Sequence, residues 1–280
     1  MHHLAATMAA LEASVTAPAL EEKPAALKVG VDLGTACTVL VVLDECDRPL
    51  ATAYEFADVV RDGVVTDFIG AVDLVRRLRK DVEARLGVCL TAAHGAYPPG
   101  VPLSEVRAVA NVIQGADLDC SGLVDEPSAA NAVLGLRDGV VVDVGGGTTG
   151  VAVVSGGEVV HTADEATGGT HFTLVIAGAL KISFDEAEAL KKDPAQQQRL
   201  FPLVRPVMEK VATIVARNVQ GRPAPKVYLV GGTVAFPGFA GAVSTASGLD
   251  AVVPVSPMFV TPLGIARCAP VSEPSYLTSY

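Results

Sequence analysis

Two segments of this chain place an aspartate just before a glycine turn, a pattern that suits phosphate chemistry. The first reads Asp32-Leu33-Gly34-Thr35, and the second reads Asp143-Val144-Gly145-Gly146-Gly147-Thr148-Thr149. A glycine turn between two strands lets backbone N–H groups converge on an anion without interference from a Cβ atom. Two carboxylates beside phosphates favour Mg²⁺, which Asp32 and Asp143 would hold largely through water. The pair therefore predicts a site for the terminal phosphates of a nucleotide, ATP or ADP, with Mg²⁺.

Three other short segments fit the same ligand. Glu126 precedes Pro127 at the expected start of a helix, where its carboxylate could direct a water towards the terminal phosphate. Gly231-Gly232-Thr233 ends an apolar strand and lets the backbone approach a flat ligand such as adenosine. Gly168-Gly169 opens a predicted helix, whose N-terminus favours an anion. The candidate catalytic residues are Glu126, Asp32 and Asp143, and the candidate nucleotide-binding residues are Gly34, Thr35, Gly145, Gly146, Gly147, Thr148, Thr149, Gly168, Gly169, Gly231, Gly232 and Thr233.

Simpler explanations exist for each of these turns taken alone. A single Asp-x-Gly turn is explained at least as well by a tight hairpin that binds nothing, but two matched copies followed by a Gly-Gly turn make that explanation much weaker. No P-loop, Rossmann or Gly-x-Ser-x-Gly motif occurs in the chain. The five cysteines show no spacing typical of a zinc site.

The surrounding elements alternate between apolar strands and amphipathic helices, which predicts an α/β architecture. The matched turns each lie between two strands, so the chain reads as two duplicated half-molecules that face each other across a cleft. The expected strands cover residues 28–32, 38–43, 90–96, 123–125, 139–143, 150–154, 158–162 and 226–230, and the expected helices include 103–114, 127–136, 170–180, 184–191, 203–220 and 239–246.

Composition limits the partners of the protein. In 280 residues, 21 Lys and Arg oppose 31 Asp and Glu, a net charge of −10 that disfavours nucleic acid and anionic membrane surfaces. The long uncharged stretch at 227–249 is broken by glycine and proline, so no membrane span is expected. The odd number of cysteines and the absence of a secretion signal indicate free thiols in a reducing cytoplasm. The basic cluster in residues 76–80 shares its helix with acidic side chains, which favours a solvated face.

The first 27 residues differ from the rest in being rich in alanine. Leu4, Met8, Leu11 and Val15 have the spacing of one helical face. They form either a short amphipathic helix on a flexible tether or a frayed end with chance periodicity, because chain termini are usually poorly ordered. Residues 1–27 are therefore assigned to a flexible N-terminal tail.

The order of the motifs resembles that of the ATPase superfamily of actin, DnaK-type chaperones and sugar kinases. In the terms of that superfamily, residues 29–38 and 139–154 correspond to the two phosphate motifs, residues 126–136 and 262–266 to the two connecting helices, and residues 227–239 to the adenosine motif. The resemblance implies the actin-like ATPase (ribonuclease H-like) fold, with ATP or ADP and Mg²⁺ in a cleft between two duplicated lobes. Lobe I would comprise residues 28–137 and 261–275, and lobe II residues 138–260.

Within that superfamily, three segments are similar to the EutJ family of bacterial ethanolamine utilization proteins. They are Ala57-Asp58-Val59-Val60-Arg61-Asp62-Gly63, Ala163-Asp164-Glu165-Ala166-Thr167-Gly168-Gly169 and Phe259-Val260-Thr261-Pro262-Leu263. The resemblance implies a chaperone-like accessory protein that protects or reactivates ethanolamine ammonia-lyase. It also implies a cytoplasmic location, oligomers and an association with the ethanolamine microcompartment. The stripe of Leu4, Met8, Leu11 and Val15 predicts that residues 1–17 are a targeting helix for the shell or a core enzyme of that compartment.

Several positions depart from the superfamily pattern. Gly150 stands where chaperone-type members have an acid, Ala235 where an arginine often stacks on adenine, and Ala36-Cys37 where a polar pair is usual. Residues 40–75 contain no lysine that would match the catalytic lysine of the chaperones. Each difference removes a charge-assisted contact, so slow ATP hydrolysis and binding without hydrolysis both stay open. The alternative function is that of a filament-forming, actin-like structural protein, which suits the compact size; a small-molecule kinase fits less well, because the chain has little room for substrate-binding insertions.

Overall fold

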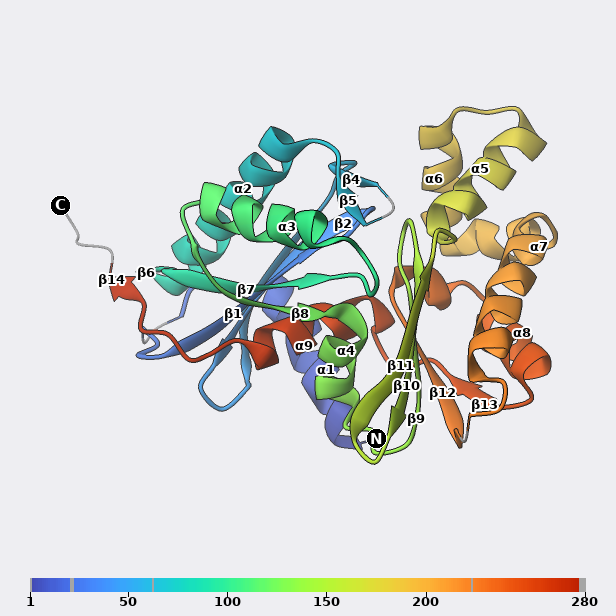
Figure 1. Cartoon of the computed structure of the whole chain (residues 1–280). Helices are drawn as coiled ribbons and strands as arrows, with labels where there is room; N and C mark the ends of the chain where they lie inside the picture. Colours follow the sequence, from blue (N-terminus) through green and yellow to red (C-terminus); the bar gives the residue numbers. More distant parts are fainter. Residues whose placement is uncertain (1, 21–22, 62, 223, 277–280) are drawn as a thin grey trace. The chain divides into compact units, whose positions relative to one another are not determined.

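The computed structural model describes residues 2–20, 23–61, 63–222 and 224–276 and divides into two compact units. Unit 1 comprises Met1–Gly135 with Met258–Tyr280, and unit 2 comprises Leu136–Pro257. Each unit contains a five-stranded mixed sheet, with the order β3-β2-β1-β7-β8 in unit 1 and β11-β10-β9-β12-β13 in unit 2 (Figure 1). Both sheets join an antiparallel three-stranded meander to two parallel strands. The duplication expected from the two aspartate turns is therefore present in the strand order.

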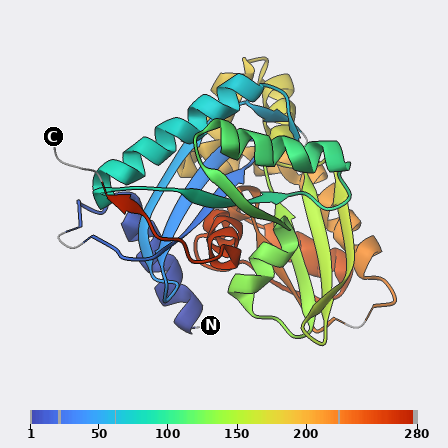
Figure 2. The same ribbon diagram turned by 60° about the vertical axis from the view of Figure 1, so that its left-hand side comes forward.

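Unit 1 packs helices on both sides of its sheet. The helices α2 and α3 lie on one side, over a core of buried residues from β1 and β2, whereas α1 and α9 lie on the other (Figure 2). Its strands are β1 (Leu27–Leu33), β2 (Cys37–Asp44), β3 (Pro49–Phe56), β4 (Val60–Arg61), β5 (Val64–Val65), β6 (Val88–Cys89), β7 (Ala92–Tyr97), β8 (Asp119–Asp125) and β14 (Ser275–Tyr276). Its helices are α1 (His2–Val15), α2 (Phe68–Leu86), α3 (Leu103–Gly115), α4 (Glu126–Leu134) and α9 (Val260–Cys268).

Helix α2 shows how the sequence sets its boundaries and its polar face. The side chain of Asp67 accepts a hydrogen bond from Gly70 N at 2.9 Å, and Gly87 ends the helix in the left-handed conformation, with a φ of 67°. Two of the basic residues expected on a solvated face form ion pairs within the protein: Arg77 pairs with Glu55 at 2.7 Å and Arg79 with Glu83 at 2.8 Å. These two arginines therefore contact acidic side chains of the same unit.

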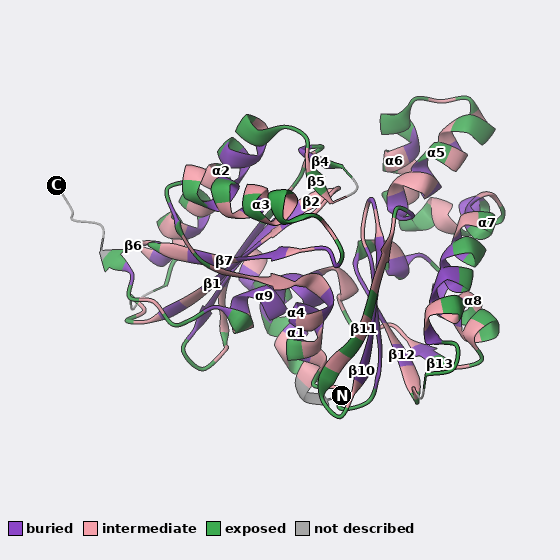
Figure 3. Cartoon of the chain, in the orientation of Figure 1, coloured by how far each residue is buried: buried purple, intermediate pink, exposed green. Residues whose placement is uncertain are grey.

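The N-terminal helix α1 is the main difference from the expected flexible tail. Met8 and Leu11 are fully buried, and the helix packs against β3. Figure 3 colours the ribbon of α1 and of the other elements by burial. The Ser14 hydroxyl lies 2.8 Å from that of Thr52, and the Arg85 guanidinium donates to the carbonyls of Ser14, Val15 and Thr52 at 2.9, 3.1 and 2.7 Å. Arg85 thus satisfies carbonyls that a helix C-terminus leaves without partners. The apolar stripe was visible in the sequence, but the surface that receives it was not.

Unit 2 buries one face of its sheet under α5, α7 and α8. Phe172 of α5 stacks on Phe239 of α8, with ring centroids 6.2 Å apart, and both rings are buried. Its strands are β9 (Gly139–Val144), β10 (Thr149–Ser155), β11 (Glu158–Glu165), β12 (Lys226–Val230) and β13 (Asp250–Val252). Its helices are α5 (Gly169–Leu180), α6 (Phe184–Lys192), α7 (Pro194–Val219), α8 (Phe239–Ser247) and the 3₁₀ turn η1 (Gly232–Ala235), and a second such turn, η2 (Pro257–Phe259), precedes α9.

Helices α4 and α9 of unit 1 cross in very close contact. A Cβ atom added to Gly264 would lie 1.8 Å from the carbonyl oxygen of Ala129. A Cβ atom on Gly30 of β1 would likewise lie 2.5 Å from the backbone nitrogen of Ala266. Only glycine allows these approaches, so they fix α9 against both the sheet and α4. Among the helices of the described residues, none combines the length and the apolar character that crossing a bilayer requires.

Candidate nucleotide-binding site

In unit 1, the first aspartate turn joins β1 to β2. The two strands pair in register as far as Leu33 opposite Thr38. A Cβ atom on Gly34 would lie 2.7 Å from Cys37 O, so the glycine allows the turn to be this tight. The N–H groups of Thr35 and Ala36 donate no hydrogen bond to any described residue. Asp32 is half-buried, near the end of β1. The turn thus leaves backbone donors available next to a carboxylate.

In unit 2, the second aspartate turn has the same construction between β9 and β10. Val144 pairs with Thr149, and Gly145 N donates to Thr148 O at 3.1 Å, which closes the turn. Within the described part of the chain, the N–H groups of Gly146, Gly147 and Thr148 have no acceptor. A run of such N–H groups is the arrangement that binds phosphate oxygens.

Two other segments of unit 2 meet this turn from outside. Gly145 O accepts hydrogen bonds from Gly169 N at 3.0 Å and from the Thr233 hydroxyl at 2.7 Å, and Gly146 O accepts one from Thr170 N at 2.8 Å. On the neighbouring strand β12, a Cβ atom on Gly231 would lie 2.5 Å from Asp143 Oδ1. The structure therefore brings together the candidate residues that the sequence placed in three separate segments of unit 2.

Gly168, Gly169 and Thr149 make close contacts and hydrogen bonds within unit 2, and their contact with a nucleotide stays a prediction. The N–H groups of Gly169 and Thr170 at the start of α5 are already used by the carbonyls of Gly145 and Gly146. A Cβ atom on Gly168 would lie 2.7 Å from both of those carbonyl oxygens. The Thr149 hydroxyl is buried and donates to Thr167 O at 2.5 Å. These residues shape and hold the turn, whereas the free donors belong to residues 146–148.

Glu126 is the first residue of α4 in unit 1. The preceding Asp125 caps the helix, because its carboxylate accepts from Ser128 N at 3.0 Å, and Pro127 in the first turn has no N–H that would need a partner. These two signals fix where the helix begins and thereby fix the backbone of Glu126. The side chain of Glu126 is half-buried.

Lys191 of α6 is a residue of this region that sequence reasoning missed. Its ammonium group donates to Gly169 O at 3.1 Å, to the Thr173 hydroxyl at 2.9 Å and to Glu188 at 2.6 Å, and only 16% of its side chain is exposed. Burial lowers the pKa of Lys191, against the opposing effect of Glu188. The spacing of Glu188 and Lys191 on a predicted helix is the sequence signal for this ion pair, whereas the superfamily resemblance places its lysine in residues 40–75. Lys191 brings a positive charge to the start of α5.

The oxygen ligands in these turns fit Mg²⁺ better than a transition metal. The described residues contain no cluster of three His, Cys, Asp or Glu that would form an all-protein metal site. Mg²⁺ does not need one, because it usually keeps several waters and binds one or two carboxylates together with substrate phosphates. Asp143, which is buried beside Gly231, and Asp32 offer one such carboxylate in each unit.

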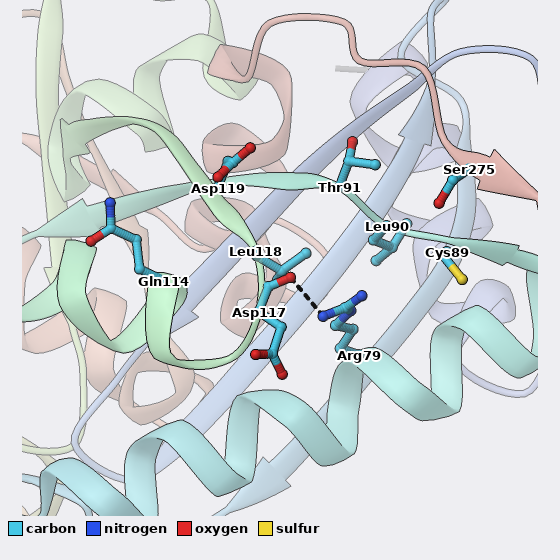
Figure 4. A pocket seen from close by; sticks show the side chains of 9 residues that line it. All are labelled: Arg79, Cys89, Leu90, Thr91, Gln114, Asp117, Leu118, Asp119 and Ser275. Atoms are coloured by element: carbon cyan, nitrogen blue, oxygen red, sulfur yellow. Dashed lines mark hydrogen bonds between the residues drawn. The ribbon is translucent and has the colours of Figure 1, made fainter.

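A cavity of about 590 Å³ in unit 1 lies away from these turns (Figure 4). It opens where β7 and β8 begin, whereas Asp32 lies near the end of β1, which runs parallel to β7. Arg79, on its floor, is held by the carbonyls of Ala116 and Asp117 at 3.0 and 2.7 Å. The cavity therefore lies at the N-terminal ends of these parallel strands, whereas the phosphate turn lies at the C-terminal end of β1, so the cavity is not part of the candidate site.

Two family models match overlapping parts of the chain. The model described as cell division protein FtsA matches residues 140–280, and the model described as MreB/Mbl protein matches residues 53–192. Crystal structures of MreB5 from Spiroplasma citri, bound to ADP and to AMPPNP, have TM-scores of 0.67 and 0.68. They cover 84% of this chain and 94% and 93% of their own, at 16% identity. This likeness shows a shared actin-like ATPase fold.

Other relatives match nearly the whole chain. The ethanolamine utilization protein EutJ of Salmonella typhimurium is 43% identical over 251 residues, which cover 89% of this chain and 88% of that protein. The crystal structure of EutJ from Carboxydothermus hydrogenoformans is 46% identical, has a TM-score of 0.88 and covers 95% of this chain and 98% of its own.

Proposed function

This chain belongs to the EutJ family of ethanolamine utilization proteins, and we propose that it works there as a nucleotide-binding accessory protein. The observation that carries the proposal is the turn at residues 145–148. Its Gly146, Gly147 and Thr148 N–H groups have no acceptor among the described residues, while the rest of the turn is held by hydrogen bonds from Gly169, Thr170 and Thr233. Donors that are fixed before the ligand arrives need no reorganisation when a phosphate binds.

The ligand proposed is ATP or ADP with Mg²⁺. The turns at residues 34–36 and 145–148 would each donate backbone hydrogen bonds to nucleotide phosphates, and Asp32 and Asp143 would hold the ion through its water ligands. When bound, Mg²⁺ neutralises charge on the phosphates. The fold supports this proposal, since MreB5 of Spiroplasma citri binds ADP and AMPPNP with the same fold.

Isothermal titration with ATP, ADP and a non-hydrolysable analogue, each with Mg²⁺, tests this proposal. We expect binding by the wild-type protein and at least tenfold weaker binding by Asp143→Asn, a loss of about 1.4 kcal/mol. The matched control is Asp138→Asn, in the same unit, because Asp138 binds Ser155 and Gly156 on an exposed hairpin. Absence of binding up to millimolar nucleotide would refute the proposal, and equal losses in both variants would remove Asp143 from the site.

Hydrolysis is tested separately by phosphate release. Glu126 is the residue proposed to direct the attacking water. Gly150 stands where chaperone-type members of the superfamily have an acidic residue, so this chain has no carboxylate at that position. We therefore propose turnover that is slow relative to nucleotide exchange. Glu126→Gln should reduce phosphate release while binding is kept; unchanged release would show that Glu126 has no part in the reaction.

The proposed client is ethanolamine ammonia-lyase, which this protein would protect or reactivate in a chaperone-like way. Membership of the EutJ family supports this role. Inactivated lyase should regain activity with the wild-type protein and ATP–Mg²⁺, but not with the Asp143→Asn variant. Recovery that is independent of nucleotide, or no recovery at all, would contradict the role. The proposed association with the microcompartment is tested with a fluorescent fusion of the full chain in cells that form the compartment, because Met8 and Leu11 of α1 are buried in the folded protein. Diffuse fluorescence would contradict the association.

A filament-forming, actin-like role is the second candidate, because the MreB/Mbl model matches residues 53–192. The cell shape-determining protein MreB of Escherichia coli is 31% identical over 138 residues, which cover 45% of this chain and 38% of that protein. Sedimentation at micromolar protein distinguishes the two candidates. ATP-dependent pelleting would favour the filament, and protein that stays in the supernatant favours the accessory role.

A further inference from the structure

The hydroxyl of Thr233 lies at the meeting point of the three turns of unit 2. Thr233 follows β12 in η1, and its Oγ1 donates a hydrogen bond of 2.7 Å to the carbonyl of Gly145, the first residue of the second aspartate turn. The same carbonyl accepts from Gly169 N at 3.0 Å. Thr233 therefore links the Gly-Gly turn after β12 to the aspartate turn and, through Gly145, to the start of α5.

The Thr233 hydroxyl is confined between Gly145 and Gly169. A Cβ atom on Gly169 would lie 2.6 Å from Thr233 Oγ1, so the glycine leaves room for the threonine side chain. A hydroxyl has a single hydrogen, and here it is used by Gly145 O. Thr233 thus has no hydrogen left to donate to a ligand.

We infer that Thr233 is a positioning residue for phosphate, not the ligand contact that its sequence pattern indicates. The inference rests on the proposed function, namely that a nucleotide binds this turn. By fixing the carbonyl of Gly145 towards η1, Thr233 keeps the following N–H groups of Gly146, Gly147 and Thr148 directed at the ligand. The ligand class that depends on Thr233 is therefore the nucleoside di- and triphosphates, since a nucleoside without phosphates does not use these donors.

Two variants separate the hydroxyl from the shape of the side chain. Thr233→Val keeps the branched shape and removes the hydrogen bond, and Thr233→Ser keeps the hydroxyl. The matched control is Thr213→Val in α7, because the Thr213 hydroxyl also donates to a backbone carbonyl, Glu209 O at 2.9 Å, but on an exposed face. All variants are made in the full chain.

The first measurement is isothermal titration with ATP, ADP and adenosine. Loss of one hydrogen bond should weaken ATP and ADP binding to Thr233→Val about fivefold and leave adenosine binding within about twofold. Thr233→Ser should restore wild-type affinity, and Thr213→Val should match the wild type. Equal affinity of Thr233→Val and the wild type for ATP, or an equal loss for ATP and adenosine, would overturn the inference.

The second measurement is amide hydrogen exchange of the protein without nucleotide. A turn that has lost its anchor should open more often, so the hydrogen-bonded amides of Gly145, Gly169 and Thr170 should exchange faster in Thr233→Val and at the wild-type rate in Thr233→Ser. If the wild type binds no nucleotide, the proposed function fails, whatever the exchange rates are. If the wild type binds ATP but exchange and affinity are unchanged in Thr233→Val, the positioning role alone fails.

Discussion

Replacing Gly264 by alanine should destabilise unit 1, although alanine is the better helix former. A Cβ atom at this position lies 1.8 Å from Ala129 O and 2.4 Å from Ala129 C, both backbone atoms that cannot rotate away. Real Cβ contacts essentially never fall below 3.0 Å, so α4 and α9 must separate by roughly 1 Å or more. Ala129 and Ile265 are fully buried at this crossing, and the separation disrupts their packing.

The expected magnitude is the difference of two opposing effects. Overpacking of a close contact costs about 3 kcal/mol at the upper end of the usual range, which applies because the obstacle is backbone. Replacing glycine by alanine inside a helix returns about 1 kcal/mol. The free energy of unfolding should therefore fall by about 2 kcal/mol.

Urea denaturation followed by circular dichroism measures this change, and Gly178→Ala is the control. Gly178 also lies inside a helix, α5, but a Cβ atom there meets nothing within 4 Å. The control should therefore raise the free energy of unfolding by the helix-propensity effect alone, about 1 kcal/mol, and raise the midpoint accordingly. If Gly264→Ala raised the midpoint as the control does, the close approach of α4 and α9 would not constrain the fold, and the reasoning would be refuted.

Three further predictions follow from buried polar groups. Thr38→Val should raise the unfolding free energy by about 1 kcal/mol in urea denaturation, because the buried Thr38 hydroxyl has no hydrogen-bond partner among the described residues; a loss of stability would show that it has one. Arg85→Met should release α1 and lower the free energy of unfolding by about 2 kcal/mol, because Arg85 donates three hydrogen bonds to backbone carbonyls at the C-terminal end of α1 and in β3. The linker after α1 should then be cleaved faster in limited proteolysis, and cleavage at the wild-type rate would show that Arg85 does not hold α1. Burial raises the pKa of Glu188, but the ion pair with Lys191 and the hydrogen bonds to Glu188 lower it below its ordinary value. The contribution of Glu188 to the free energy of unfolding is therefore present above pH ~5 and is lost as the pH falls through the lowered pKa. Glu188→Gln should therefore be less stable than the wild type at pH 7, and the difference should shrink as the pH falls through the lowered pKa of Glu188; a difference that is constant with pH would disprove the linkage.

The sequence predicted the fold class correctly, because the signals for it are local. Apolar strands on both sides of each aspartate turn predicted β1, β2, β9 and β10, and the family comparisons confirm the actin-like ATPase fold and the EutJ resemblance. Strand β3, however, was not predicted. Its Ala51 and Ala53 are buried but small, so the alternation of apolar and polar residues in β3 is weak even though it completes the sheet.

A local cap explains one of the other differences, and a long-range contact explains another. Helix α7 begins at Pro194, well before the predicted start at residue 203, because Asp193 caps it and Pro202 and Pro206 lie inside it without ending it. Docking of α1 depends on Arg85, about 70 residues further along the chain. A single sequence gives the periodicity of such a helix but not the partner that decides whether it packs.

The glycines of the candidate site show the same limit more sharply. In the sequence, every glycine beside a strand end is an equal candidate for contact with phosphate. The structure divides them by what their missing side chains make room for: Gly168 and Gly231 admit other parts of the protein, the carbonyls of the aspartate turn and the carboxylate of Asp143. The N–H groups without acceptors belong instead to residues 146–148. A site built this way needs more glycine than its ligand touches, because the turn must first be anchored by its neighbours before its donors can be held in place for phosphate.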